Sequence, residues 1–188
     1  MRWVTASGVR HFSLHIAPNL GKRATPVSWV RTFGRKVTIM IIGIPRELLP
    51  GENRVAATPT TVPALLKLGY EVVVEAGAGE HAAQPDRAYE EAGARIVEPG
   101  EAWKADLVLA VNEPTDDQIS LMRAGAVLVT FLHPRQDLAL TEKLAAAGVT
   151  GLSMDMVPRI SRAQSMDALS SMANISGYRA VVEAAFAY

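Results

Sequence analysis

The chain has 188 residues, of which 49% are hydrophobic and none is cysteine. This composition excludes a disordered chain, a disulfide framework, a cysteine-bearing zinc site and thiol catalysis. The 19 basic side chains balance the 19 acidic ones, but residues 40–188 hold only 12 bases against those 19 acids, and their net charge of −7 argues against nucleic-acid binding.

Residues 1–39 differ in composition from the rest of the chain. They carry seven basic side chains and no acidic one, which is the composition of an organelle transit peptide and would place the protein in an organelle matrix. A simpler interpretation is that translation begins at Met40, directly before an ordinary first strand, because residues 1–39 show no sustained amphipathic helix. On either interpretation this basic extension is disordered or not native, and it does not enter the prediction of the fold.

From residue 37 onward, short apolar runs alternate with runs of helical pattern. The longest apolar run, VTIMIIGI, ends before Pro45 and falls short of the roughly 18 residues that a membrane span needs, so no direct membrane span is expected. The alternation predicts a doubly wound, mostly parallel α/β sheet of Rossmann-like type with helices on both faces. The predicted strands are 37–44, 71–75, 94–97, 106–111, 126–132 and 149–153, and the predicted helices are 58–69, 86–93, 115–125 and 138–148, with a helical turn around Trp103.

The first of these helices is predicted to begin with Thr58 as its N-cap and Pro59 at the first helical position. Further along, GAGEHA at residues 77–82 follows a strand and matches a dinucleotide fingerprint. The fingerprint requires a helix that begins inside the motif, whereas Pro85 and Asp86 mark a later start. We therefore interpret residues 77–82 as an ordinary Gly-rich connection.

Two residues in the loops after the strands could take part in chemistry. Arg54 lies in the loop after the first strand, together with Glu47, and could either clamp a carboxylate or phosphate or form an internal ion pair that fixes the loop. His133 follows an apolar strand and could act as a general acid or base or be purely structural. Its spacing from the other histidines supports no metal site.

The segment PRISRAQSMDALSSMANISGYRAV, residues 158–181, carries an unusual polar stripe. At helical spacing Gln164, Asp167 and Ser170 share one face, and Arg159 and Arg162 precede them. A capping box formed by Ser161 and Gln164, with Asp167 favoured by the helix dipole, would account for part of the stripe. It leaves the two arginines and Ser170 unexplained, so a binding role is a second interpretation.

From residue 40 to its end, the chain resembles the N-terminal part of the alpha subunit of proton-translocating NAD(P) transhydrogenases, a family that shares its architecture with alanine dehydrogenase. The motifs IGIPRE, KLGYEVVVE, EAGAG and RVAATP are similar to both branches. The long segment 158–181 resembles the transhydrogenase branch. By this resemblance, residues 40–164 form the N-terminal domain, and 165–188 form a helix leading to a further dinucleotide-binding domain that lies outside this sequence.

The resemblance also implies a function. Arg159, Gln164, Asp167 and Ser170 would contact or orient the nicotinamide of NAD, and hydride would pass directly to NADP⁺ held by a partner component, so no catalytic acid or base is expected. The implied partners are the membrane and NADP-binding components, which translocate protons and would hold the protein at the inner face of the cell membrane, and a second copy in a homodimer. The chain alone is expected to be inactive.

Alanine dehydrogenase is the alternative within this resemblance. In that branch an arginine at the position of Arg54, a lysine at the position of Asn112 and a histidine at the position of His133 handle the keto acid. Asn112 cannot supply the cation, which argues against amino-acid oxidation. A third hypothesis is a fragment that folds but catalyses nothing.

Overall fold

The computed structural model describes residues 39–188, so the prediction for the basic extension lies outside the described residues except at Ile39. The described residues belong to one unit of the chain. The division of this unit into 40–164 and 165–188 stays a prediction. In the described part of the chain, no helix is both long and apolar enough to cross a membrane.

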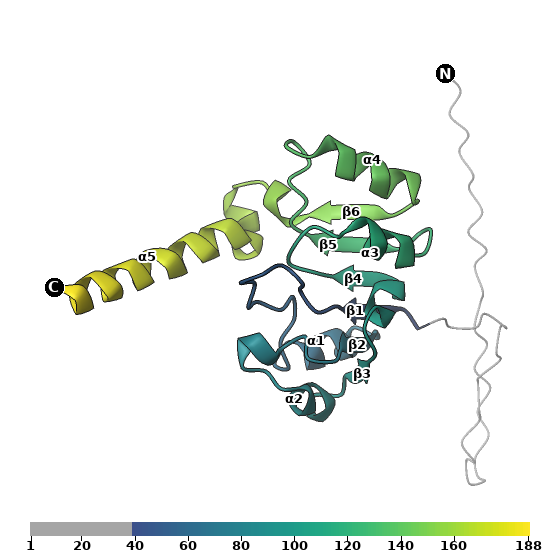
Figure 1. The fold of residues 1–188 in the computed structure, drawn as a ribbon, viewed down its shortest axis with the longest axis horizontal. Helices are drawn as coiled ribbons and strands as arrows, with labels where there is room; N and C mark the ends of the chain where they lie inside the picture. The colour runs from purple at the N-terminus through teal and green to yellow at the C-terminus, as the bar shows by residue number, and fades with distance from the viewer. Residues whose placement is uncertain (1–38) are drawn as a thin grey trace, which may run out of the picture. The chain divides into compact units, whose positions relative to one another are not determined.

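Six parallel strands form one sheet in the order β3-β2-β1-β4-β5-β6 (Figure 1). The strands are β1 Ile41–Ile44, β2 Glu71–Glu75, β3 Arg95–Val97, β4 Leu107–Leu109, β5 Val127–Thr130 and β6 Thr150–Ser153. The predicted doubly wound parallel sheet is therefore confirmed. The strand order reverses between β1 and β4, and the crevice beyond the carboxyl ends of strands at such a point is where ligands bind in this class of fold.

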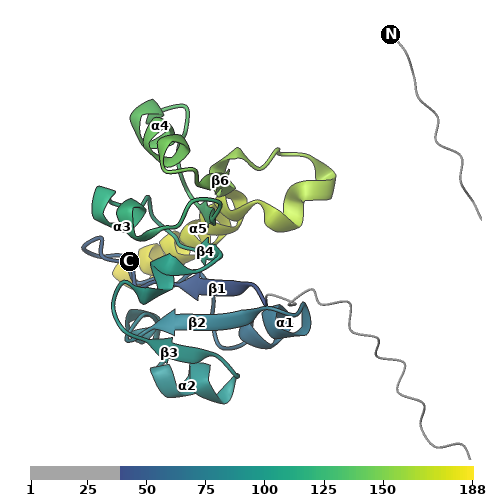
Figure 2. The ribbon, with the colours of Figure 1, turned by 90° about the vertical axis from the view of Figure 1, so that its right-hand side faces the viewer.

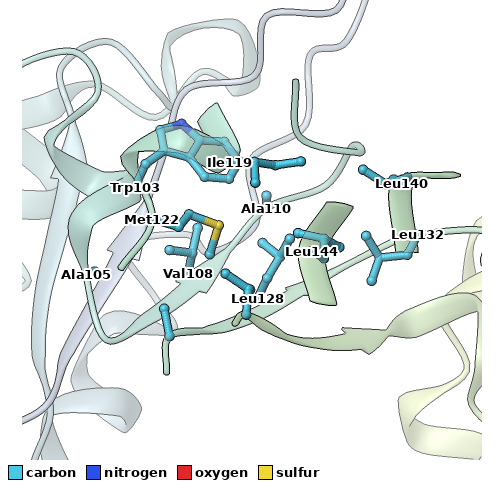
Figure 3. Close-up of a cluster of buried hydrophobic side chains, with 12 residues drawn as sticks. Trp103, Ala105, Val108, Ala110, Ile119, Met122, Leu128, Leu132, Leu140 and Leu144 are labelled. Atoms are coloured by element: carbon cyan, nitrogen blue, oxygen red, sulfur yellow. The ribbon is translucent and has the colours of Figure 1, made fainter. Parts of the chain in front are cut away.

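Buried side chains form a core on each face of the sheet. Alternate residues of β1 and β2, such as Ile42 and Val72, pack with Val62 and Tyr89 on one face. Val108 and Leu128 pack with Trp103 and the helices after β4 and β5 on the other face (Figure 3). The helices are α1 Val62–Lys67, α2 Asp86–Glu91, α3 Asp116–Leu121, α4 Leu138–Ala146 and α5 Ala168–Ala187, and the 3₁₀ turns are η1 Glu80–Ala82, η2 Glu101–Lys104, η3 Met154–Met156 and η4 Ser161–Met166. Helices α3 and α4 lie on one side of the strands and α1 on the other (Figure 2).

Helix α1 begins three residues later than the sequence predicted. Thr61, and not Thr58, is its N-cap residue, so the prediction of a cap at Thr58 and a first helical residue at Pro59 was wrong. The Thr61 hydroxyl donates to the Thr58 carbonyl at 2.8 Å and accepts from the Thr58 N–H at 3.0 Å. These bonds close a separate turn ahead of the helix, because a threonine hydroxyl can satisfy the backbone locally in place of helical hydrogen bonds.

The last helix also begins later than the predicted start at residue 165. The 3₁₀ turn η4 comes first, and α5 starts at Ala168 with Asp167 as its N-cap residue. All residues of α5 after Ala168 are exposed. In Figure 1 this yellow helix extends away from the strands. The N-terminal end of α5 approaches η3, and Ala168 and Met172 in it line a hollow together with Arg54.

Candidate functional site

The turn η4 and the start of α5 form one open hollow of about 270 Å³, called here the polar hollow. The structure brings together in it all four residues that the resemblance assigned to nicotinamide binding, whereas Arg162 does not line it. It also adds two that the sequence analysis had not assigned to binding. The lining residues are Arg159, Ile160, Ser161, Gln164, Asp167 and Ser170.

The spacing of the polar residues explains why they converge. Ser161, Gln164, Asp167 and Ser170 follow one another at intervals of three. In a 3₁₀ helix, which has three residues per turn, side chains three apart lie directly above one another. In one continuous α-helix, as predicted from the sequence, the same residues would drift around the axis. The 3₁₀ turn η4 therefore aligns Ser161 with Gln164. Asp167 and Ser170 follow as the N-cap residue and part of the first turn of α5.

The predicted capping box does not form. The N-cap residue of η4 is Ile160, and the turn has no side-chain cap. Asp167 instead caps α5, because its carboxylate accepts from the Ser170 backbone N–H at 3.1 Å and from the Ser170 hydroxyl at 2.5 Å. Sequence reasoning had favoured Asp167 near the start of a helix for its charge, but had placed that start several residues too early.

Asp167 is held as a carboxylate acceptor. The Ser170 hydroxyl and then the Ser170 backbone N–H hold the pKa of Asp167 below its ordinary value of 3.8. Burial opposes these two hydrogen bonds, and the charge of Arg159 adds a smaller lowering effect. Asp167 is only 8% exposed. The polar hollow thus combines one ionised acceptor with a guanidinium, an amide and two hydroxyls, which suits a neutral ligand that both donates and accepts hydrogen bonds.

A second hollow, of about 390 Å³, lies beyond the carboxyl ends of β1, β4 and β5 and is called here the switch-point hollow. Asn112 and His133 line it, whereas Arg54 does not. Arg54 instead lines a neighbouring hollow beside Met166 and Met172 of the η4–α5 segment. The three residues that the sequence grouped as a substrate pocket therefore face two different spaces.

The carboxylates of Glu47 and Glu52 accept hydrogen bonds within this group of residues. The Arg54 guanidinium donates to Glu52 at 2.7 Å through Nε and at 2.5 Å through a terminal nitrogen. This bidentate bond is the main cause that lowers the pKa of Glu52 to about 2. The Asn112 amide donates to Glu52 at 3.1 Å and to Glu47 at 2.9 Å. Glu52 was not predicted from the sequence, although an acid two residues before an arginine is a signal for such a pair.

His133 takes part in no metal cluster. Its ring nitrogen Nδ1 lies 3.0 Å from Glu113, and its ring stacks on Phe131 with centroids 6.4 Å apart. Within residues 39–188, no group of three or more His, Asp or Glu side chains could hold a metal ion. The backbone of His133 has a φ of 43°, which is unusual for a residue with a side chain and is often found at functional or strained positions.

The Gly-rich segment 77–82 has the geometry of a connection. The Gly77 N–H donates to both carboxylate oxygens of Asp86, at 2.9 and 3.1 Å. Helix α2 begins only at Asp86, after the short turn η1. Because the chain's own carboxylate takes the donor that a phosphate would need, the structure agrees with the interpretation of an ordinary connection.

Comparison with known proteins gives consistent matches. The family described as alanine dehydrogenase/PNT, N-terminal domain, matches residues 43–176. The NAD(P) transhydrogenase subunit alpha of Haemophilus influenzae is 57% identical over 146 residues, which are 78% of this chain and 28% of that protein. The alanine dehydrogenase of Bacillus subtilis is 38% identical over 139 residues, which are 73% of this chain and 36% of that protein.

A solved structure gives a similar result. The crystal structure of a transhydrogenase from Sinorhizobium meliloti matches with a TM-score of 0.75 and 45% identity, and the match covers 79% of this chain and 45% of that one. The chain thus spans between 28% and 45% of the length of these proteins.

Proposed function

The chain belongs to the alanine dehydrogenase/PNT N-terminal domain family, and on this premise we propose that it is part of the NAD(H)-binding alpha subunit of an NAD(P) transhydrogenase. Its identity to a transhydrogenase alpha subunit is 57%, against 38% to an alanine dehydrogenase. The observation that carries the proposal is the convergence of Arg159, Gln164, Asp167 and Ser170 in the polar hollow.

The residues of the polar hollow fit the nicotinamide end of NAD. A carboxamide offers two N–H donors and one carbonyl acceptor. The Asp167 carboxylate can accept from the carboxamide nitrogen, while Arg159 and Gln164 can donate to its carbonyl. Because Ser170 already holds Asp167 in place, the acceptor is oriented before the ligand arrives. Preorganisation of this kind reduces the cost of ordering the site on binding.

The role of these residues in the reaction is orientation. When bound, the reduced nicotinamide ring of NADH would supply a hydride for NADP⁺ held by a partner component, which requires a fixed ring more than an acid or base. Arg159, Gln164, Asp167 and Ser170 would fix the carboxamide edge of the ring. The membrane and NADP-binding components would couple the reaction to proton translocation at the inner face of the membrane, and two alpha subunits would form a homodimer.

An alanine dehydrogenase-like oxidoreductase is the second candidate, and it would use Arg54, Asn112 and His133. The hydrogen bonds of Arg54 and of Asn112 argue against this second candidate. The Arg54 guanidinium is already bound by Glu52, and Asn112 faces both Glu47 and Glu52 without contributing a positive charge. A keto acid carboxylate placed there would be repelled by the two carboxylates, so the contacts favour the transhydrogenase proposal.

The test is Arg159→Ala in a complete alpha subunit reconstituted with its partner components. If Arg159 orients the nicotinamide, hydride transfer slows by on the order of a hundredfold or more, while NADH affinity weakens much less. Arg162→Ala is the matched control, because Arg162 follows Arg159 by three residues, in η4, but does not line the polar hollow. Equal losses in rate and affinity would make Arg159 a general binding residue, and an unchanged rate would remove it from the site.

A further inference from the structure

Ile160 is the one apolar side chain among the six that line the polar hollow. It is 56% exposed and belongs to neither hydrophobic core. A single exposed isoleucine is common on protein surfaces and by itself needs no explanation. Ile160 differs from such residues in its surroundings, because the side chains that share the hollow with it all carry hydrogen-bonding groups.

The backbone holds Ile160 in place on both sides. Its N–H donates to the Pro158 carbonyl at 2.9 Å, and its carbonyl accepts from the Ala163 N–H at 2.9 Å. Its backbone is extended, with φ −124° and ψ 156°, at the point where η4 begins. A β-branched side chain is also restricted in rotation about its first bond. The position of this apolar surface is therefore fixed without support from core packing.

A nicotinamide ring has a polar carboxamide edge and two apolar faces. Gln164, Asp167 and Ser170 suit the edge, which leaves a face of the ring to be covered. We propose that Ile160 is a positioning residue that packs against one face of the nicotinamide ring. This inference rests on the proposed function of the polar hollow. With its edge hydrogen-bonded and one face against Ile160, the ring keeps a single orientation and presents its other face to the hydride acceptor.

The test is nuclear magnetic resonance of the full chain with labelled isoleucine methyl groups, titrated with millimolar nicotinamide mononucleotide. Methyl protons above the face of an aromatic ring are shielded, so the Ile160 methyl signals should move upfield with the oxidised probe. The reduced probe has lost ring aromaticity and should produce a much smaller upfield shift. The backbone amides of Gln164 and Ser170 report in the same titration whether the carboxamide binds.

The affinity of isoleucine variants for the probe provides a second measurement. Ile160→Ala should weaken binding of the probe about tenfold. Ile160→Val should weaken it less, because valine retains more of the apolar contact than alanine does. Ile175→Ala is the matched control, because Ile175 is 61% exposed on α5 and lies outside the hollow, and it should leave affinity unchanged. Thermal unfolding of all three variants should match that of the unaltered chain, because neither isoleucine belongs to a core.

The outcomes separate this inference from the proposed function. Shifts at Gln164 and Ser170 without an upfield shift at Ile160, or equal affinity in Ile160→Ala, would overturn the role of Ile160 and leave the polar hollow as the nicotinamide site. If none of these signals responds to the oxidised probe at millimolar concentration, both the inference and the proposed site are wrong.

Discussion

At the scale of single residues, Asp167 links the candidate site to the helix that follows it. Its carboxylate caps α5 through Ser170 and also lines the polar hollow. Removing its charge would affect both the acceptor in the hollow and the first turn of α5. Because the cap uses the charge of Asp167, its strength depends on pH.

We expect the first turn of α5 to fray in acid. The pKa of Asp167 is lowered in the folded chain relative to its ordinary value of 3.8. The stabilisation is therefore fully present above pH 3.8 and is lost as the pH falls through the lower folded value. The measurement is the pH dependence of the Ser170 amide signal. Asp167→Asn is the control, because an amide oxygen can still accept from Ser170 but does not titrate. A midpoint at or above 3.8 would contradict the assignment.

At the scale of elements, the close contact between β1 and η2 shapes the region around the switch-point hollow. A Cβ atom on Gly43 would lie 1.9 Å from the Ala102 carbonyl oxygen and 2.8 Å from the Ala105 Cβ. Only a glycine therefore lets the strand and the turn approach this closely. The same turn carries Trp103, which packs in the core and also lines the switch-point hollow.

Gly43→Ala should consequently destabilise the chain by roughly 3 kcal/mol, because the strand and the turn must move apart in a packed core. The midpoint of urea unfolding is the measurement. Gly177→Ala serves as the control, since a Cβ at Gly177 meets no atom within 4 Å and alanine favours a helix by roughly 0.5–1 kcal/mol. A Gly43→Ala chain as stable as the unaltered one would show that the two elements are not packed as described.

At the scale of the whole molecule, the described loops offer a dinucleotide little besides the polar hollow. The donor of Gly77 in the Gly-rich connection is taken by Asp86. Charge-assisted hydrogen bonds contribute roughly 1.5–3 kcal/mol each at best, and less in an open hollow, while immobilising a ligand costs several kcal/mol. The nicotinamide end alone therefore cannot hold NADH tightly.

We expect this chain alone to bind NADH only at millimolar concentrations or above, and to catalyse neither transhydrogenation nor alanine oxidation. Calorimetric titration with NADH measures the first, and spectrophotometric assays with NADP⁺ or alanine measure the second. A micromolar dissociation constant would contradict this expectation and indicate that residues 77–82 bind the dinucleotide after all. Asp86→Ala, which frees the Gly77 N–H, would then identify that segment by raising the affinity further.

The sequence by itself determined the class of fold and the segment that carries the candidate site. Apolar runs of strand length alternating with helical runs predict a parallel sheet, because hydrophobic period and chain punctuation are local properties. The long segment 158–181 indicated by its residue types, and by its resemblance to transhydrogenases, which side chains to examine. The identity of Arg159, Gln164, Asp167 and Ser170 as a group required no structure.

Only the tertiary structure decided how those side chains are used. A 3₁₀ turn and an α-helix differ little in local preference, so the sequence could not predict that η4 aligns residues three apart or that Asp167 caps α5. The bond between Asn112 and Glu52 joins residues 60 positions apart. The apolar surface of Ile160 becomes part of a polar hollow only through the local geometry of η4 and the start of α5. Such relations depend on contacts distant in sequence or on small differences in backbone geometry, which residue patterns do not encode.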